Sequence, residues 1–231
     1  MTLLRVLSAG AVKRGVAQIA GEFACATGSK VECEFVPVPE LRQRVLAGET
    51  ADVYVATPAA MDDFAAQGRI FPDSRGFVGR SRMGVVVHAG AALPAIGDTP
   101  SFIEVLRNAG AVVHNEASSG LYAAKLISEL GLAQELAARI VMVKGGAAVM
   151  EYVAAHPGAV GLAQISEVMV LIDRGCAVKL AAPLPDAVQN FTSYDAAAAV
   201  AGRAPDAARK LARALTSAEA RKTFAATGID R

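Results

Sequence analysis

The chain has 231 residues, of which 53% are hydrophobic, and this is enough for one large folded domain or two small lobes. Its 23 basic and 22 acidic residues are mixed along the sequence and leave a formal charge of +1, which favours neither nucleic acid nor a membrane surface as partner. No apolar run approaches the roughly 18 to 20 residues of a membrane span. We therefore expect no membrane insertion.

Short β-branched runs alternate with alanine-rich helical runs, a pattern typical of a mainly parallel sheet covered by helices. The predicted class is α/β. A helix with one apolar face is expected between the first two strands, ending at Gly28. We expect strands near residues 4–8, 31–36, 52–56, 83–88, 111–114, 140–143, 159–164, 177–181 and 191–200.

Three predicted strand-to-helix junctions follow one another in the first third of the chain. The first helix follows directly on residues 8–11, the second is expected over 41–47 after Pro37 and Pro39, and the third begins near Pro58. All three junctions would lie on one edge of a sheet, where α/β folds bind ligands.

A fourth junction reads Glu116-Ala-Ser-Ser-Gly-Leu-Tyr-Ala-Ala-Lys-Leu126. Ser118 could be an ordinary N-cap that satisfies unpaired backbone N–H groups. The same N–H groups and the helix dipole could instead bind a phosphate, carboxylate or oxyanion. Both interpretations remain open from this stretch alone.

Cysteine and histidine usage argues against metal and disulfide chemistry. Cys25, Cys33 and Cys176 are an odd number without metal-ligand spacing, and the chain has only three histidines. Dinucleotide, phosphate-loop and nucleophile-elbow motifs are also absent from the sequence. We expect no metal and no cofactor.

The sequence starts with Met1-Thr-Leu-Leu-Arg5, which runs straight into a strand-like segment without the features of a secretory leader. As it stands, the sequence predicts a cytoplasmic protein. It would be periplasmic if a leader has been removed.

Five blocks in order resemble the molybdate-binding solute receptors of ABC transporters. They are the segments at 4–11, 46–57, 118–122, 145–146 and 160–166, and the resemblance continues to 223–229. It implies the two-lobed type II periplasmic-binding-protein fold, with lobe 1 at 1–81 plus 190–231 and lobe 2 at 82–189. It also implies a ligand held in the cleft between the lobes by hinge closure, and an ABC permease as partner if the protein is exported.

The side chains that would hold molybdate in that family are replaced here. The two serine positions correspond to Ala11 and to Val38 or Pro39, and the tyrosine position corresponds to Gln164. A buried dianion needs most of its oxygens hydrogen-bonded. The resemblance therefore implies a different small anion, and we expect a di- or tricarboxylate.

The predicted ligand-binding set combines these junctions. Lys13 and Lys144 could instead be solvated surface residues, and Tyr122 could instead serve to pack its helix. The full set is Ser8, Gly10, Ala11, Lys13, Pro39, Thr57, Ser118, Ser119, Gly120, Tyr122, Lys144, Gly145, Gly146 and Gln164.

Two functions are consistent with this pattern. The first is a solute-binding protein for a small organic anion. The second, suggested by isomerases such as aconitate isomerase that are related to the molybdate receptors, is a cofactor-independent double-bond isomerase of a small unsaturated carboxylic acid, acting by proton abstraction and return. The candidate bases are Glu116, His114, Lys13 and Tyr122, and whether the chain is an enzyme stays open.

Overall fold

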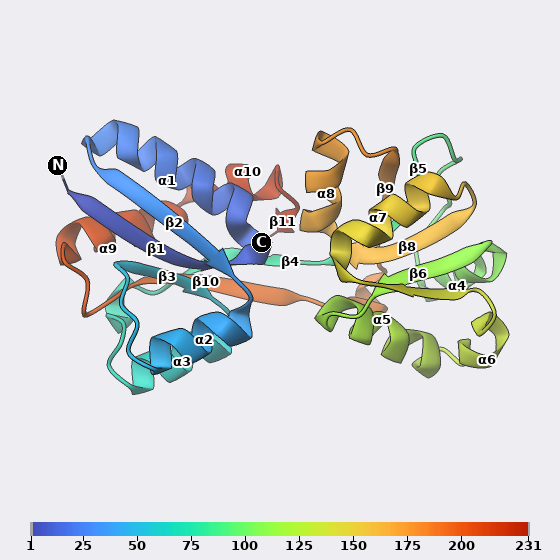
Figure 1. Cartoon of the computed structure of the whole chain (residues 1–231), viewed down its shortest axis with the longest axis horizontal. Helices are drawn as coiled ribbons and strands as arrows, with labels where there is room; N and C mark the ends of the chain where they lie inside the picture. The colour runs from blue at the N-terminus through green and yellow to red at the C-terminus, as the bar shows by residue number, and fades with distance from the viewer. Residues whose placement is uncertain (1, 231) are drawn as a thin grey trace. The chain divides into compact units, whose positions relative to one another are not determined.

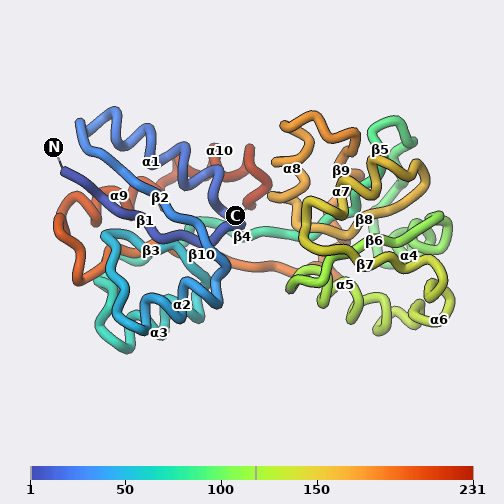
Figure 2. The backbone as a smooth tube through the Cα atoms, in the orientation of Figure 1, coloured from blue at the N-terminus to red at the C-terminus, as the bar shows by residue number. Residues whose placement is uncertain are grey.

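The computed structural model describes residues 2–230, with the exception of the Ser118 side chain. The chain divides into two compact units: unit 1 comprises Met1–Arg80 and Thr192–Arg231, and unit 2 comprises Ser81–Phe191. The ranges expected from the sequence differ from these by one residue at the first boundary and two at the second. Figure 2 follows the chain as it leaves unit 1 and later returns to it.

Unit 1 is built on a six-stranded sheet in the order β11-β4-β10-β3-β1-β2. Strand β1 lies parallel to both β2 and β3, and β10 runs antiparallel to β3. The strands are β1 (Leu3–Ala9), β2 (Lys30–Val36), β3 (Val53–Ala56), β4 (Gly76–Ser81), β10 (Thr192–Ala198) and β11 (Ile229–Asp230).

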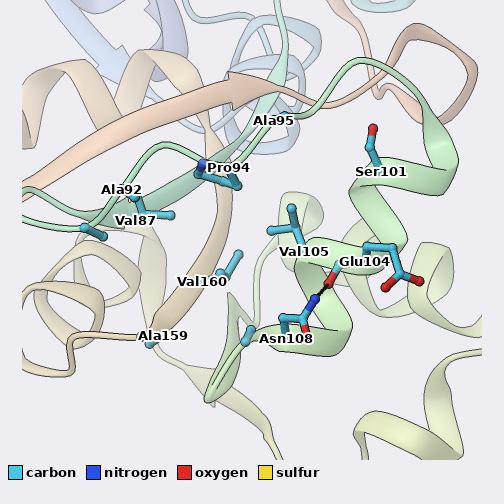
Figure 3. A pocket seen from close by; sticks show the side chains of 13 residues that line it. Val87, Ala92, Pro94, Ala95, Ser101, Glu104, Val105, Asn108, Ala159 and Val160 are labelled. Atoms are coloured by element: carbon cyan, nitrogen blue, oxygen red, sulfur yellow. Dashed lines mark hydrogen bonds between the residues drawn. The ribbon is translucent and has the colours of Figure 1, made fainter.

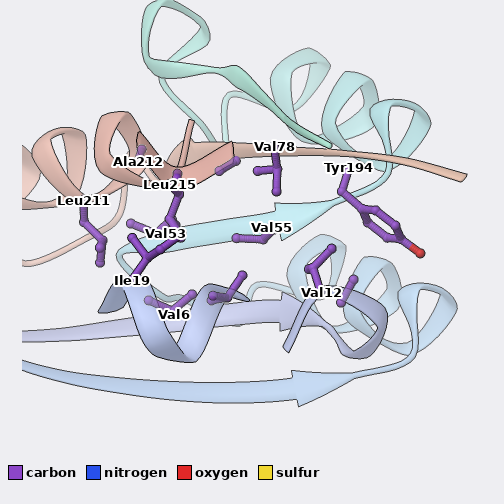
Figure 4. Packing of buried hydrophobic residues seen from close by; sticks show 14 of the residues in the cluster. Val6, Val12, Ile19, Val53, Val55, Val78, Tyr194, Leu211, Ala212 and Leu215 are labelled. Carbon is purple, nitrogen blue, oxygen red and sulfur yellow. The ribbon is translucent and has the colours of Figure 1, made fainter. Parts of the chain in front are cut away.

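Helices cover both faces of this sheet (Figure 1). On one face α1, α9 and α10 enclose a valine- and leucine-rich core, shown in Figure 4. On the other face α2 and α3 bury Leu41, Met61 and Phe64. The helices are η1 (Gly10–Val12), α1 (Lys13–Thr27), α2 (Val38–Leu46), α3 (Pro58–Ala66), η2 (Pro72–Ser74), α9 (Pro205–Leu215) and α10 (Ala218–Ala225).

Unit 2 is built on a five-stranded sheet in the order β7-β6-β8-β5-β9. Strand β6 is parallel to β7 and β8, whereas β5 is antiparallel to β8 and β9. The strands are β5 (Met83–His88), β6 (Ala111–Asn115), β7 (Ile140–Val143), β8 (Ala159–Gln164) and β9 (Val178–Pro183).

Two groups of helices bury the faces of the unit 2 sheet. Helices α4, α5 and α6 pack on one face around Phe102 and Leu126, and α7 and α8 pack on the other around Val149 and Val168. The helices are α4 (Thr99–Asn108), α5 (Ser118–Glu129), α6 (Ala133–Leu136), α7 (Gly145–Ala155), α8 (Ile165–Asp173) and η3 (Asp186–Val188).

The predicted α/β class is confirmed, and all nine expected strands are present. Each sheet is mixed, with three parallel strands next to antiparallel ones. The prediction that the second helix covers 41–47 is wrong at its start, because α2 begins at Val38 and takes Pro39 into its first turn, a position that proline tolerates. Within residues 2–230, none of the helices has the length and apolar character needed to cross a membrane.

Candidate functional site

The strand register brings the predicted junctions of unit 1 to one edge of its sheet. Ser8 pairs with Phe35 of β2 and with Val55 of β3, so the three strands end side by side. We call the segments that follow them, residues 8–13, 37–39 and 57–58, the helix-start edge of unit 1. Parallel strands that end together in this way form the usual ligand-binding edge of an α/β sheet.

The same arrangement occurs in unit 2. Asn115 of β6 pairs with Val143 of β7, and Val113 pairs with Gly161 of β8, so β6, β7 and β8 also end together. We call residues 115–120, 144–146 and 164–167 the helix-start edge of unit 2. Each unit therefore gathers the residues of its predicted strand-to-helix junctions at one edge, and Tyr122 of α5 lies beyond these segments.

Side-chain hydroxyls are poorly placed on the helix-start edge of unit 1. Ser8 is completely buried, and its hydroxyl donates to the carbonyl of Ala9 at 3.1 Å. Thr57 is the N-cap of α3, but its side chain makes no capping hydrogen bond. The Ser8 hydroxyl is thus committed to the protein backbone, and of these two predicted donors only Thr57 remains at the edge.

The other predicted residues of this edge supply backbone and one cation. Gly10 and Ala11 lie in the 3-10 turn η1 that leads into α1, and Lys13 is the first residue of α1 and is exposed. Pro39 is exposed in the first turn of α2 and has no N–H to offer. Among the predicted residues, this edge therefore offers one cation, the amine of Lys13, and one remaining hydroxyl, that of Thr57.

Asn115, which was not predicted as a functional residue, organises the start of α5 in unit 2. Its Oδ1 accepts hydrogen bonds from the backbone N–H groups of Ala117 and Gly120, both at 3.0 Å. Its Nδ2 donates to the hydroxyl of Ser119 at 3.1 Å. An asparagine within a few residues of a helix start commonly bonds its backbone N–H groups, so the sequence did contain this information.

The start of α5 differs accordingly from the sequence-based expectation. The N-cap is Ala117, and Ser118 is the first helical residue, so the alternative that Ser118 is the N-cap is wrong. The side chain of Ser118 lies outside the described residues. Ser119 is 4% exposed and bonded to Asn115, and the N–H of Gly120 is already used. Only the earliest N–H groups of α5 remain for an anion.

Tyr122 packs against the core of unit 2 and holds a distant segment. Its hydroxyl donates to the carbonyl of Val188 in η3 at 3.1 Å. Burial raises the pKa of the Tyr122 hydroxyl above its ordinary value, so the group stays protonated at neutral pH. These observations favour the packing interpretation of Tyr122 over a role as base.

Replacing Tyr122 with phenylalanine should lower the free energy of unfolding by about 1 kcal/mol, because the Val188 carbonyl loses its donor while the ring still packs. Urea denaturation followed by circular dichroism measures this change. Unchanged stability of Tyr122→Phe would show that water replaces the hydroxyl at no cost.

His114 and Glu116, the predicted acid/base pair, face different surroundings. His114 is 4% exposed, and its Nδ1 lies 3.1 Å from the carbonyl of Asn115, which can only accept. Glu116 is exposed, just beyond the end of β6. Among the described residues, the hydrogen-bond partner of the His114 ring is thus the backbone carbonyl of Asn115. Glu116 is the more accessible of the two for chemistry with a dissolved substrate.

Lys144, Gly145 and Gly146 form the start of α7. Lys144 is the N-cap and is exposed, and Gly145 has a positive φ of 77°. The backbone of Gly146 lies against the carboxylate of Glu167 from α8. Sequence reasoning missed Glu167, although an acidic residue three positions after an N-cap is a familiar feature of helix starts.

Gln164, at the position of the receptor family's tyrosine, is the N-cap of α8 and is half-buried. Its Oε1 is buried and has no hydrogen-bond partner among the described residues. The N–H of Ile165, the first residue of α8, donates to the carbonyl of Arg82 at 2.9 Å. The side-chain amide of Gln164 is therefore the less committed polar group at this helix start.

A cavity of about 440 Å³ in unit 2 lies away from these helix starts (Figure 3). It is lined mainly by apolar groups, among them Val87, Pro94, Val105 and Val160. Ala159 and Val160 begin β8, whereas Gln164 ends it, so the cavity is at the opposite end of that strand. This location and lining do not suit a small anion.

Comparison with known proteins adds relatives that span the whole chain. The family model described as bacterial extracellular solute-binding protein matches residues 4–230. An aconitate isomerase of Pseudomonas sp. is 28% identical over 237 residues, which cover 99% of this chain and 88% of that protein.

Solved structures with the same fold cover the chain equally well. A substrate-binding domain ascribed to a molybdenum ABC transporter of Clostridium difficile is 18% identical, with a TM-score of 0.82 over 100% of this chain and 99% of that one. The periplasmic molybdate-binding protein of Azotobacter vinelandii is 19% identical, with a TM-score of 0.72 over 99% of each chain. At these identities the likeness confirms the periplasmic-binding-protein fold and leaves the ligand open.

Proposed function

Because the chain belongs to the bacterial extracellular solute-binding protein family, we propose that it binds a small anion at a helix-start edge, and that this anion is a di- or tricarboxylate. The observation that carries the proposal is the composition of these edges. Several helices begin there, and Lys13 and Lys144 stand at two of the starts. Helix starts and lysines attract carboxylates.

The shortage of side-chain hydroxyl donors also favours a polycarboxylate over a tetrahedral oxyanion. Ala11 and Pro39 offer no side-chain donor, and the Ser8 hydroxyl is bonded to the backbone. A compact tetrahedral dianion needs donors all around it. A polycarboxylate has its charges spread over several carbon atoms, so the helix starts and the lysine of one edge can each take one group.

Ligand-induced stabilisation tests this proposal. A bound ligand at a hundred times its dissociation constant adds about 2.7 kcal/mol of stability. For a chain of this length this corresponds to a rise in Tm of about 5–10 °C. We expect such a rise with cis-aconitate, trans-aconitate, citrate or another member of a di- and tricarboxylate panel. A comparable rise with molybdate alone would contradict the proposal.

A second function, isomerisation of an unsaturated carboxylic acid, is favoured by the relative from Pseudomonas sp., an aconitate isomerase 28% identical across almost the whole chain. In such a reaction a base removes a proton from a carbon next to the double bond. The electron pair shifts through the allylic system, and a proton returns to one of its ends, so the step involves no net oxidation or reduction. The accessible carboxylate of Glu116 and the exposed amine of Lys13 are the candidate bases that the structure leaves available.

Incubation of cis- and trans-aconitate with the protein in deuterated water, followed by proton NMR, tests the second function. Interconversion of the isomers with deuterium at an allylic carbon would support it. Binding of aconitate without interconversion or exchange would restrict the chain to a binding role.

A further inference from the structure

We infer that Glu167 determines anion specificity at the helix-start edge of unit 2, by occupying the start of α7 and disfavouring compact inorganic dianions there. This inference rests on the proposed function in that it concerns the same edge. Glu167 lies outside the ligand-binding set predicted from the sequence.

The carboxylate of Glu167 contacts the backbone of Gly146 directly. A β-carbon placed on Gly146 would lie 1.9 Å from Oε2 and 2.6 Å from Cδ of Glu167. No other residue type fits at position 146 while the carboxylate keeps this place. The side chain of Glu167 comes from the first turn of α8, so one helix start supplies a carboxylate to another.

Electrostatics explain why a carboxylate is stable in this position. Helix α7 has 11 residues, its N-cap Lys144 makes no side-chain capping bond, and its first turn contains no acidic residue of its own. The positive end of its dipole therefore lacks a local anion. Glu167 provides one from α8.

A ligand that approaches α7 consequently meets a negative charge. Like charges within a few ångströms disfavour binding, and the effect is largest for an ion that concentrates two charges in one small group. A polycarboxylate has its charges on separate carbon atoms, so one of its groups can bind at the start of α5 without another entering the start of α7. The position of the Glu167 side chain thus disfavours compact inorganic dianions more than polycarboxylates.

The experiment measures dissociation constants of sulfate and molybdate by isothermal titration calorimetry for the unaltered protein, Glu167→Gln and Glu151→Gln. Glu151 is exposed farther along α7, so its replacement removes the same charge from unit 2 without touching the start of the helix. We expect Glu167→Gln to bind both anions about tenfold more tightly or better, and Glu151→Gln to behave like the unaltered protein.

Gly146→Ala provides a second variant that keeps the charge of the chain. Its methyl group excludes the carboxylate from its present position, so oxyanion binding should again tighten, by a smaller factor. The inference is overturned if neither variant at this contact binds sulfate or molybdate more tightly, or if Glu151→Gln gains as much as Glu167→Gln. Circular dichroism establishes that each variant is folded.

Trans-aconitate and citrate serve as parallel probes with the same proteins. If the unaltered protein binds none of the carboxylates but Glu167→Gln gains oxyanion binding, the proposed function fails and the role of Glu167 stands. If the unaltered protein binds a tricarboxylate while the variants gain no oxyanion affinity, the proposed function stands and the role of Glu167 fails.

Discussion

Gly120→Ala should lower the free energy of unfolding by about 3 kcal/mol or more, because the helix start leaves no room for a methyl group. An alanine β-carbon at position 120 would lie 1.6 Å from the carbonyl oxygen of Asn115 and 2.4 Å from its carbonyl carbon. Both are backbone atoms at the end of β6, so the strand or the helix would have to shift. The shift would also break the bond from the Gly120 N–H to Asn115 Oδ1. Urea denaturation measures the loss.

Gly21→Ala is the matched control for this prediction. Gly21 lies within α1, is exposed, and has open space where a β-carbon would be. Alanine there should raise stability by about 0.5–1 kcal/mol, because glycine loses more backbone freedom on folding. If Gly120→Ala were as stable as the unaltered protein, the packing of α5 on Asn115 would not be as described.

The strands whose bounds the sequence predicted best are short, continuous apolar runs. Met83–His88, Ile140–Val143 and Ala159–Gln164 have the predicted bounds, because continuous apolar runs flanked by glycine, charge or proline are a strong local signal. Strands β4 and β11 were missed. The first contains Gly76 and Gly79, and the second has two residues, so their strand structure comes from pairing with neighbours in the sheet.

The positions of the strand-to-helix junctions could be predicted from the sequence, but the hydrogen bonding of their polar groups could not. Junctions between strands and helices can be read from the sequence, and the register places them on common edges. The backbone N–H groups that stay free at a helix start depend on which side chains fold back to bond them. Asn115 does so across five residues and could have been noticed, whereas Glu167 reaches Gly146 across 21 positions and requires the packing of α8 beside α7.

The polar groups that the protein already uses at its helix starts bear on which ligand it can bind. At α5 the protein satisfies part of the helix start with its own amide, and at α7 it places its own carboxylate. A receptor for a tetrahedral oxyanion would benefit from leaving such groups open. The structure instead leaves lysines and a glutamine side chain at the edges, which is the reason for favouring a carbon-based acid as ligand.

The last helix, α10, packs a buried aromatic ring against α1, the helix that starts the first junction of unit 1. Phe224 of α10 is 1% exposed and belongs to the same core as Val16 and Ile19 of α1. A β-carbon at Gly15 would lie 2.3 Å from its ring, which shows how closely α1 approaches it. Because α1 begins at Lys13, the ring fixes the helix that starts the first junction.

Phe224→Ala should therefore lower the free energy of unfolding by about 3–5 kcal/mol, since it removes buried apolar surface and leaves a cavity against α1. Hydrogen exchange should also accelerate at α1 amides before global unfolding. Urea denaturation and exchange followed by mass spectrometry measure the two effects. Phe77→Ala on β4 is the control: Phe77 is 44% exposed, so its loss should change stability by about 0.5 kcal/mol or less. Equal losses for both variants would show that Phe224 does not hold α1 in place.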